Sequence, residues 1–131
     1  MAKYILVIED DDFVVDLYKE CLSPEVEEPP FPNHQIIILT NLDDVYKFYD
    51  EYWEDIDVIV TDSDLPDGTG EEFIAKIKEM VGKQYRKKII FVAGQPPKTG
   101  YEILFFRIFQ KPVGISDFLE SIKAALEASA K

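Results

Sequence analysis

The chain has 131 residues, with 26 acids against 14 lysines and arginines, so its formal net charge is −12. A hydrophobic content of 47% excludes a disordered tail, and the longest uncharged apolar runs are too short to cross a membrane. The negative charge argues against direct binding to nucleic acid or to anionic lipid, because both present phosphate groups. We therefore expect a cytoplasmic, globular protein in which residues 1–131 form a single domain.

Short apolar runs, which predict β-strands, alternate along the chain with stretches of helical period. In chain order, the predicted elements are a strand at Tyr4–Ile8, a helix at Asp12–Leu22, a strand at Gln35–Leu39, a helix at Leu42–Trp53, a strand at Val58–Thr61, a helix between Thr69 and Gly82, a strand at Lys88–Ala93, a short helix at Tyr101–Phe105, a strand at Phe106–Gln110 and a helix at Ser116–Ala128. Such alternation is typical of a parallel sheet with helices on both faces. We therefore predict a doubly wound α/β fold.

Local signals indicate several helix boundaries. Pro24 is expected to stop the first helix, and Asn41 is a favourable N-cap for the second. Thr69 and Glu72 form a capping box at the start of the third helix, and Gly82 is expected to end it. Prolines and a glycine leave room for only one or two turns of the fourth. The residues expected on the inward face of the first helix are Phe13, Val14, Leu17 and Cys21.

Two segments do not fit a regular pattern. Residues 23–34 carry four of the eight prolines and predict an extended surface loop. His34 lies in this loop, and we expect it to be exposed to solvent rather than bound to a metal. The aromatic-rich stretch Tyr101–Phe109 is expected to be mostly core, and any contact with a partner is placed there.

Acidic side chains follow the first and the third predicted strands. Glu9 and Asp10, with two further aspartates, come after the first, and Asp62 and Asp64 come after the third. The carboxyl ends of parallel strands form the ligand-binding edge of such sheets, so neighbouring strands would bring these carboxylates together. Their mutual repulsion requires a counter-ion, and Mg²⁺ is the natural one. The helix dipole accounts for the two further aspartates but not for Asp62.

The motifs "ILVIEDDD", "DVIVTDSDLPDGTG" and "FQKPV" together resemble the receiver domain of two-component response regulators. The resemblance covers essentially the whole chain in order, including a proline four residues and a glycine eight residues after Asp62. It implies a flavodoxin-like sheet of five parallel strands in the order 2-1-3-4-5. It also implies a cis peptide bond after the lysine of the last motif.

The resemblance implies a role for each site residue. Asp62 matches the phosphoacceptor. Glu9 and Asp10 match the acidic pair that positions Mg²⁺, Asp10 directly and Glu9 through water. Asp64 lies at the position whose backbone carbonyl ligates the metal. Lys111 matches the lysine that pairs with the acidic centre and, after reaction, with the phosphoryl group.

By this resemblance the chain is a phosphoacceptor signalling switch of a two-component phosphorelay. A sensor histidine kinase, a phosphotransfer protein or a small phosphodonor would transfer a phosphoryl group to Asp62 with Mg²⁺ as cofactor. The change would alter a protein-binding surface for a downstream target or a homodimer through the Tyr101–Phe109 region. We do not expect a turnover enzyme, although autodephosphorylation fits this chemistry. No output domain follows in the sequence, so the chain acts on a separate protein or is one piece of a longer polypeptide.

Two positions depart from the family pattern. The Ser or Thr that normally ends the fourth strand is replaced by Ala93, or by Val92 if the register slips by one, and Gly94 follows. The aromatic residue normally found three positions before the lysine is replaced by Ile108. The usual route for the signal is therefore missing at these atypical switch positions.

Two other functions compete with this interpretation. One is a receiver-like interaction module that phosphorylation does not switch, which the missing hydroxyl and aromatic groups favour. The other is a phosphatase with an aspartate nucleophile, because "TDSD" after an apolar strand is similar to the Asp-x-Asp motif of haloacid-dehalogenase enzymes. Those enzymes carry a further acidic motif downstream, and apart from the adjacent Glu71 and Glu72 this chain has no clustered acids between Asp67 and the last helix.

Overall fold

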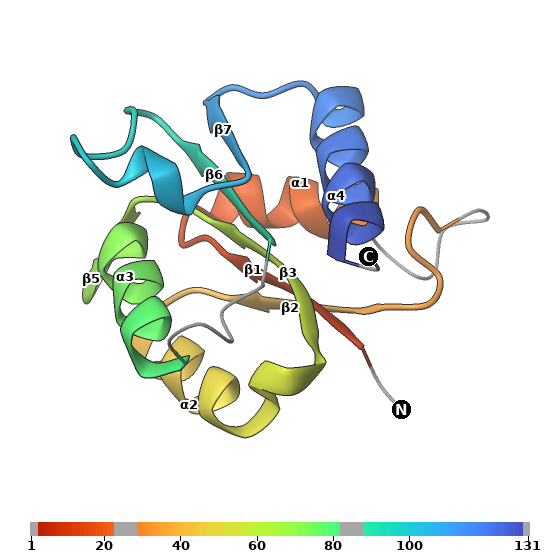
Figure 1. The fold of residues 1–131 in the computed structure, drawn as a ribbon. Helices are drawn as coiled ribbons and strands as arrows, with labels where there is room; N and C mark the ends of the chain where they lie inside the picture. The colour runs from red at the N-terminus through yellow and green to blue at the C-terminus, as the bar shows by residue number, and fades with distance from the viewer. Residues whose placement is uncertain (1–2, 23–28, 82–87, 130–131) are drawn as a thin grey trace.

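The structure is a computed structural model that describes residues 3–22, 29–81 and 88–129 (Figure 1). Its centre is a sheet of five parallel strands in the order β2-β1-β3-β6-β7. These strands are β1 (Tyr4–Ile8), β2 (Gln35–Leu39), β3 (Ile56–Thr61), β6 (Lys88–Ala93) and β7 (Arg107–Gln110). The predicted flavodoxin-like order is confirmed. The small hairpin of β4 (Asp64–Leu65) and β5 (Gly68–Thr69) was not predicted and stands outside this sheet.

Helices cover both faces of the sheet, as predicted (Figure 1). They are α1 (Asp12–Leu22), α2 (Leu42–Tyr52), α3 (Gly70–Val81) and α4 (Ile115–Ser129), with 3₁₀ turns η1 (Trp53–Asp55) and η3 (Glu102–Leu104). The first core lies between the sheet and α2 and α3, and includes Leu6, Ile59 and Phe73. The second lies between the sheet and α1 and α4. None of the helices in the described ranges is long and apolar enough to span a membrane.

Alternation along β1 explains how one sheet supports both cores. Ile5 and Val7 of β1 belong to the core beneath α1 and α4. Leu6 and Ile8 belong to the core on the other face. Because successive side chains of a strand point to opposite faces, a strand between two helical layers must be apolar throughout.

The helix starts follow the predicted caps. The side chain of Asn41 accepts the amide hydrogen of Asp44 at 2.9 Å, and the hydroxyl of Thr69 accepts that of Glu72 at 3.1 Å. A carboxylate also caps α2: Asp67, on the β4–β5 turn, accepts the amide hydrogens of the first two α2 residues at 2.7 and 3.0 Å. These bonds hold the pKa of Asp67 below its usual value. The predicted stops at Pro24 and Gly82 lie outside the described residues.

The predicted inward face of α1 is correct only in part, because Val14 and Cys21 pack against the core beneath the helix and Phe13 does not. Phe13 is 79% exposed, and the buried residues of this helix are Val15, Tyr18 and Leu22. Apolar residues occur around much of α1, so its helical period fits two adjacent faces. In the face that is buried, Tyr18 stacks on Phe118 of α4, with ring centroids 4.7 Å apart. Val14, Leu17 and Cys21 are half-buried beside this contact.

The predicted exposure of His34 to solvent is wrong. Its ring is half-buried, and Nε2 lies 2.9 Å from Oδ2 of Asp57 at the start of β3. The pair joins the segment before β2 to a strand two positions away in the sheet. A histidine following a run of prolines gives no sequence signal for a partner 23 residues away.

The segment between β6 and β7 contains only the turn η3, in agreement with the short fourth helix that was predicted. β7 starts one residue later than expected and forms an edge of the sheet. Three apolar side chains here are exposed in part or almost fully: Ile103 at 81%, Ile108 at 42% and Phe106 at 38%. The stretch Tyr101–Phe109 is thus less buried than the sequence indicated.

Candidate functional site

The acidic residues meet because β1 and β3 are adjacent and end at the same level. Ile8 and Thr61 are partners in the parallel register, and the amide of Asp62 donates to the carbonyl of Ile8 at 3.0 Å. On the other side, the amide of Glu9 donates to the carbonyl of Leu39 on β2 at 3.1 Å. The sheet ladder therefore extends beyond the strand ends and positions the backbone of both acids.

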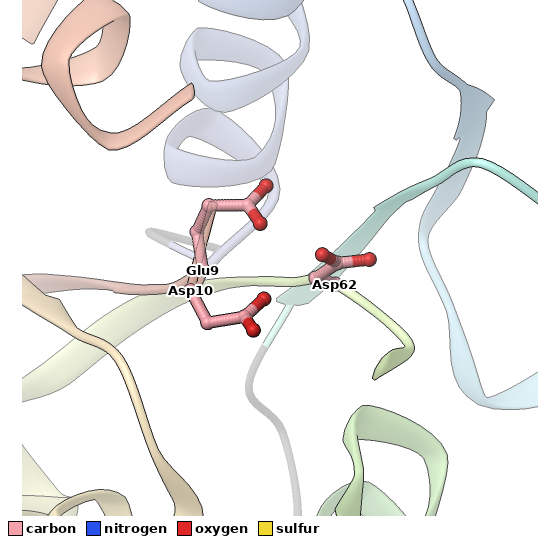
Figure 2. Close-up of side chains that lie close together, drawn as sticks. All are labelled: Glu9, Asp10 and Asp62. Atoms are coloured by element: carbon pink, nitrogen blue, oxygen red, sulfur yellow. The ribbon is translucent and has the colours of Figure 1, made fainter. Parts of the chain in front are cut away.

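Glu9, Asp10 and Asp62 form a compact cluster (Figure 2). Each offers a carboxylate oxygen within 4.8 Å of the others. Glu9 is 1% exposed and Asp62 is 8% exposed, whereas Asp10 is open to solvent. Two of the three carboxylates are thus withdrawn from water. Their mutual repulsion is stronger in this buried environment than it would be in solvent.

Lys111 follows the edge strand β7, and its side chain reaches this cluster. Its amide donates to the carbonyl of Ala93 at 2.8 Å, and the expected cis peptide bond links it to Pro112. Its Nζ lies 2.7 Å from Oε1 of Glu9 and 3.1 Å from Oδ2 of Asp62. One ammonium group therefore bridges the two buried carboxylates. It forms no ion pair with the third carboxylate, that of Asp10.

Burial and the two charges set the protonation of this group. Burial raises the pKa of Glu9 to about 7; Asp62 adds to this effect, and Lys111 opposes it. Burial disfavours the charge on Lys111, but its hydrogen bonds to Glu9 and Asp62 outweigh burial and raise its pKa. The lysine is consequently a cation at neutral pH, and the carboxyl of Glu9 titrates in the physiological range.

Replacing Glu9 with glutamine is expected to flatten the pH dependence of stability. The carboxyl titrates near 4.5 in the unfolded chain and near 7 in the folded one, so between these values the folded state binds more protons. The unfolding free energy of the native chain therefore falls as pH rises through this window, by up to about 1.4 kcal/mol per pH unit. The variant lacks this contribution. Urea titrations without metal, at several pH values across the window, measure the difference. A native chain as insensitive to pH as the variant would contradict it.

The cluster fits a hard divalent cation. It offers three carboxylates on one side of a single lysine, and oxygen ligands of this kind are those that Mg²⁺ prefers. Glu9, Asp10 and Asp62 would hold the ion. The predicted backbone ligand, Asp64, lies on β4 directly after this cluster, opposite Thr69 of β5, with its side chain exposed. Its role as a carbonyl ligand stays a prediction.

The two atypical positions lie on β6 and β7. Ala93 is the last residue of β6 and is 1% exposed, and the exposed Gly94 follows it. Ile108 lies on the edge strand β7, beside Phe91 in the register, and is partly exposed. The end of β6 near Lys111 therefore carries a methyl group at the position where the family pattern has a hydroxyl.

Sequence reasoning missed a buried acid next to this site. Glu71, in the first turn of α3, is 1% exposed, and its Oε1 accepts the hydroxyl hydrogen of Ser63 at 2.7 Å. The signal was available, because Glu71 precedes the inward-facing Ile74 by three residues and so shares its face of the helix. The first turn of a helix commonly carries exposed acids, and this pattern concealed it.

The sequence matches no family model and no curated protein, whereas solved structures match over nearly the whole chain. A CheY-like receiver domain protein from Methanospirillum hungatei has a TM-score of 0.77 at 23% identity, covering 99% of this chain and 98% of that one. The signal receiver domain of an HD domain-containing protein from Pseudomonas fluorescens has a TM-score of 0.77 at 15% identity, with the same coverage. The BeF3-activated DrrB receiver domain has a TM-score of 0.73 at 24% identity, covering 97% and 99%. At these identities the fold is what is shared: the chain has the fold of the receiver domains of response regulators.

Proposed function

We propose that residues 1–131 form one receiver domain that acts in the cytoplasm as a phosphoacceptor switch, with Asp62 as the acceptor and Mg²⁺ as the cofactor. The observation that supports this most is the bridge of Lys111 between the buried Glu9 and Asp62, beside the open Asp10. The phosphodonor is a sensor histidine kinase, a phosphotransfer protein or a small phosphorylated molecule. The chain is a switch rather than a turnover enzyme.

The residues present suit an in-line transfer. An oxygen of Asp62 forms a bond to phosphorus, and the bond from phosphorus to the donor breaks, so that the donor group leaves with the electron pair. Bound Mg²⁺ would neutralise charge on the phosphoryl oxygens. Lys111 already contacts Oδ2 of Asp62 and would shift its contact to the arriving phosphoryl group. The amide of Ser63 donates to Oδ1 at 2.6 Å and fixes the rotation of the carboxylate.

The output surface we propose is the stretch Tyr101–Phe109. It combines the exposed side chains of Ile103, Phe106 and Ile108 with the free edge of β7. Exposed apolar groups gathered in this way are typical of protein contacts. A downstream protein target, or a second copy of this chain, would bind there.

Incubation with Mg²⁺ and acetyl phosphate is expected to increase the mass of the protein by one phosphoryl group. The Asp62→Asn variant should show no increase, because an amide is a poor nucleophile, and Asp64→Asn should react like the native chain. Mass spectrometry of the intact protein measures all three. An unmodified native chain would favour the interaction module, and sustained hydrolysis of p-nitrophenyl phosphate would favour the phosphatase. A mass increase that persists in Asp62→Asn would show that another residue accepts the phosphoryl group.

Replacing Ala93 with threonine is expected to slow phosphorylation by acetyl phosphate several-fold and to lengthen the life of the phosphoryl group. The added side chain narrows the pocket, and its hydroxyl can donate to a phosphoryl oxygen. Ala93→Val, which adds similar bulk without a hydroxyl, is the matched control and should slow the reaction without lengthening the lifetime. Time courses of the mass increase and of its decay measure both. Equal rates and lifetimes in the native and threonine chains would dispose of the idea.

A further inference from the structure

Glu71 has a buried carboxylate that the phosphorylation chemistry does not use. Its side chain is almost wholly withdrawn from water, at 1% exposure. Oε1 accepts the hydroxyl hydrogen of Ser63 at 2.7 Å, and Oε2 accepts the amide hydrogen of Lys98 at 3.3 Å. A buried carboxylate is costly unless it is bonded in this way, so its retention at a core-facing position needs a reason.

These bonds form a continuous chain that starts at the proposed phosphoacceptor. Oδ1 of Asp62 accepts the amide hydrogen of Ser63, and the hydroxyl of the same serine donates to Glu71. The carboxylate of Glu71 then holds the amide of Lys98, in the segment 94–101 between β6 and η3. Asp62 is therefore joined to that segment through three successive hydrogen bonds.

The segment 94–101 is also fixed next to the site at its beginning. The carbonyl of Ala93 accepts the amide hydrogen of Lys111 at 2.8 Å, and the carbonyl of Gly94 accepts a side-chain hydrogen of Gln110 at 3.2 Å. Its side chains otherwise make few contacts: all its described residues are exposed except the half-buried Pro97 and Tyr101. The bond to Glu71 is thus a principal tie between the middle of this segment and the rest of the protein.

We propose that Glu71 is a positioning residue that couples the chemical state of Asp62 to the segment 94–101. This inference rests on the proposed function. An acyl phosphate carries no charge on the carboxyl oxygens of Asp62, so the bond from the Ser63 amide changes from charge-assisted to neutral and loses about half its strength. Ser63 can then move, and with it the carboxylate of Glu71 that holds the amide of Lys98. The coupling needs neither a hydroxyl at Ala93 nor an aromatic group at Ile108.

Amide hydrogen exchange of the segment 94–101 tests the coupling, with beryllofluoride and Mg²⁺ as the mimic of the phosphoryl group. In the native chain, the mimic should speed exchange of the Lys98 amide at least threefold. In Glu71→Leu, which removes both acceptors, exchange should already be fast and the mimic should not change it. Glu71→Gln should behave like the native chain, because its oxygen can accept from Lys98 while the Ser63 hydroxyl turns to accept from its amide group.

Two further variants separate coupling from a purely structural role. Ser63→Ala cuts the chain of bonds but leaves the backbone amide that contacts Asp62, so it should abolish the response even if Glu71→Leu does not fold. Lys98→Ala keeps its backbone amide and should respond like the native chain. A response as large in Glu71→Leu and Ser63→Ala as in the native chain would overturn the coupling while leaving phosphorylation intact. Failure of the native chain to bind the mimic, seen by fluorine NMR, would instead overturn the proposed function and the coupling with it.

Discussion

Replacing Lys111 with glutamine is expected to slow the phosphorylation of Asp62 by about 100-fold. The ammonium group is the only cation within contact of the two buried carboxylates in the described part of the chain, and it lies 3.1 Å from Oδ2 of Asp62. Without it, Mg²⁺ alone would have to offset the negative charge on the transferring oxygens beside two acids. The initial rate of mass increase with acetyl phosphate at saturating Mg²⁺ measures the effect. Lys123→Gln, an exposed substitution on α4, is the control and should leave the rate unchanged.

The same substitution should tighten binding of Mg²⁺. A lysine that bonds to Glu9 at 2.7 Å competes with the metal for the same oxygen atoms, and its removal leaves the carboxylates unneutralised. A lower dissociation constant for Mg²⁺, measured by calorimetry, together with a slower reaction would separate the two roles of the residue. If Lys111→Gln instead bound Mg²⁺ more weakly, Lys111 would be part of the structure of the metal site rather than a partner of the phosphoryl group.

Replacing Gly70 with alanine is expected to lower the free energy of unfolding by about 3 kcal/mol. A Cβ at this position would collide with the backbone oxygen of Asp62 and with Oγ1 of Thr61. The backbone cannot yield locally, because the amide of Gly70 donates to the carbonyl of Ser63 at 2.8 Å. The clash should therefore displace the strand end that carries Asp62, and phosphorylation should slow as well.

Urea unfolding followed by circular dichroism measures the loss in Gly70→Ala. Gly94→Ala is the matched control: it also lies near the site, but a Cβ there meets nothing within 4 Å. Its midpoint of unfolding should be close to that of the native chain. Equal midpoints for the two variants would mean that the loop after β3 accommodates a side chain at Gly70, contrary to the close packing described.

The sequence predicted the sheet well because its strands are buried on both faces. Continuous apolar runs such as those of β1 and β3 have few alternative arrangements, and the acids that follow them mark the functional edge. The orientation of α1 was less determined. Its apolar residues surround more than half of the helix, and tertiary packing, which includes the stacking of Tyr18 on Phe118, accompanies the face that is buried.

Long-range polar contacts account for the rest of what was missed. The pairing of His34 with Asp57, and of Glu71 with Ser63 and Lys98, joins loop residues to a strand or a helix that they meet only in the folded chain. Hydrophobic periodicity carries no information about such partners, since it reports which face is buried and not which polar atoms share that face.

The free edge of β7 is positively charged, whereas the molecule as a whole is negative. Lys88 and Arg107 both lie over the ring of Phe106, at 5.7 and 5.3 Å from its centre. From residue 88 to residue 110 the chain has three basic residues and one acid, within a protein of net charge −12. Such a separation of charge gives the molecule a dipole that turns this edge toward an acidic surface before contact. Association with a partner of that kind would be fast in dilute buffer and would slow as ionic strength rises.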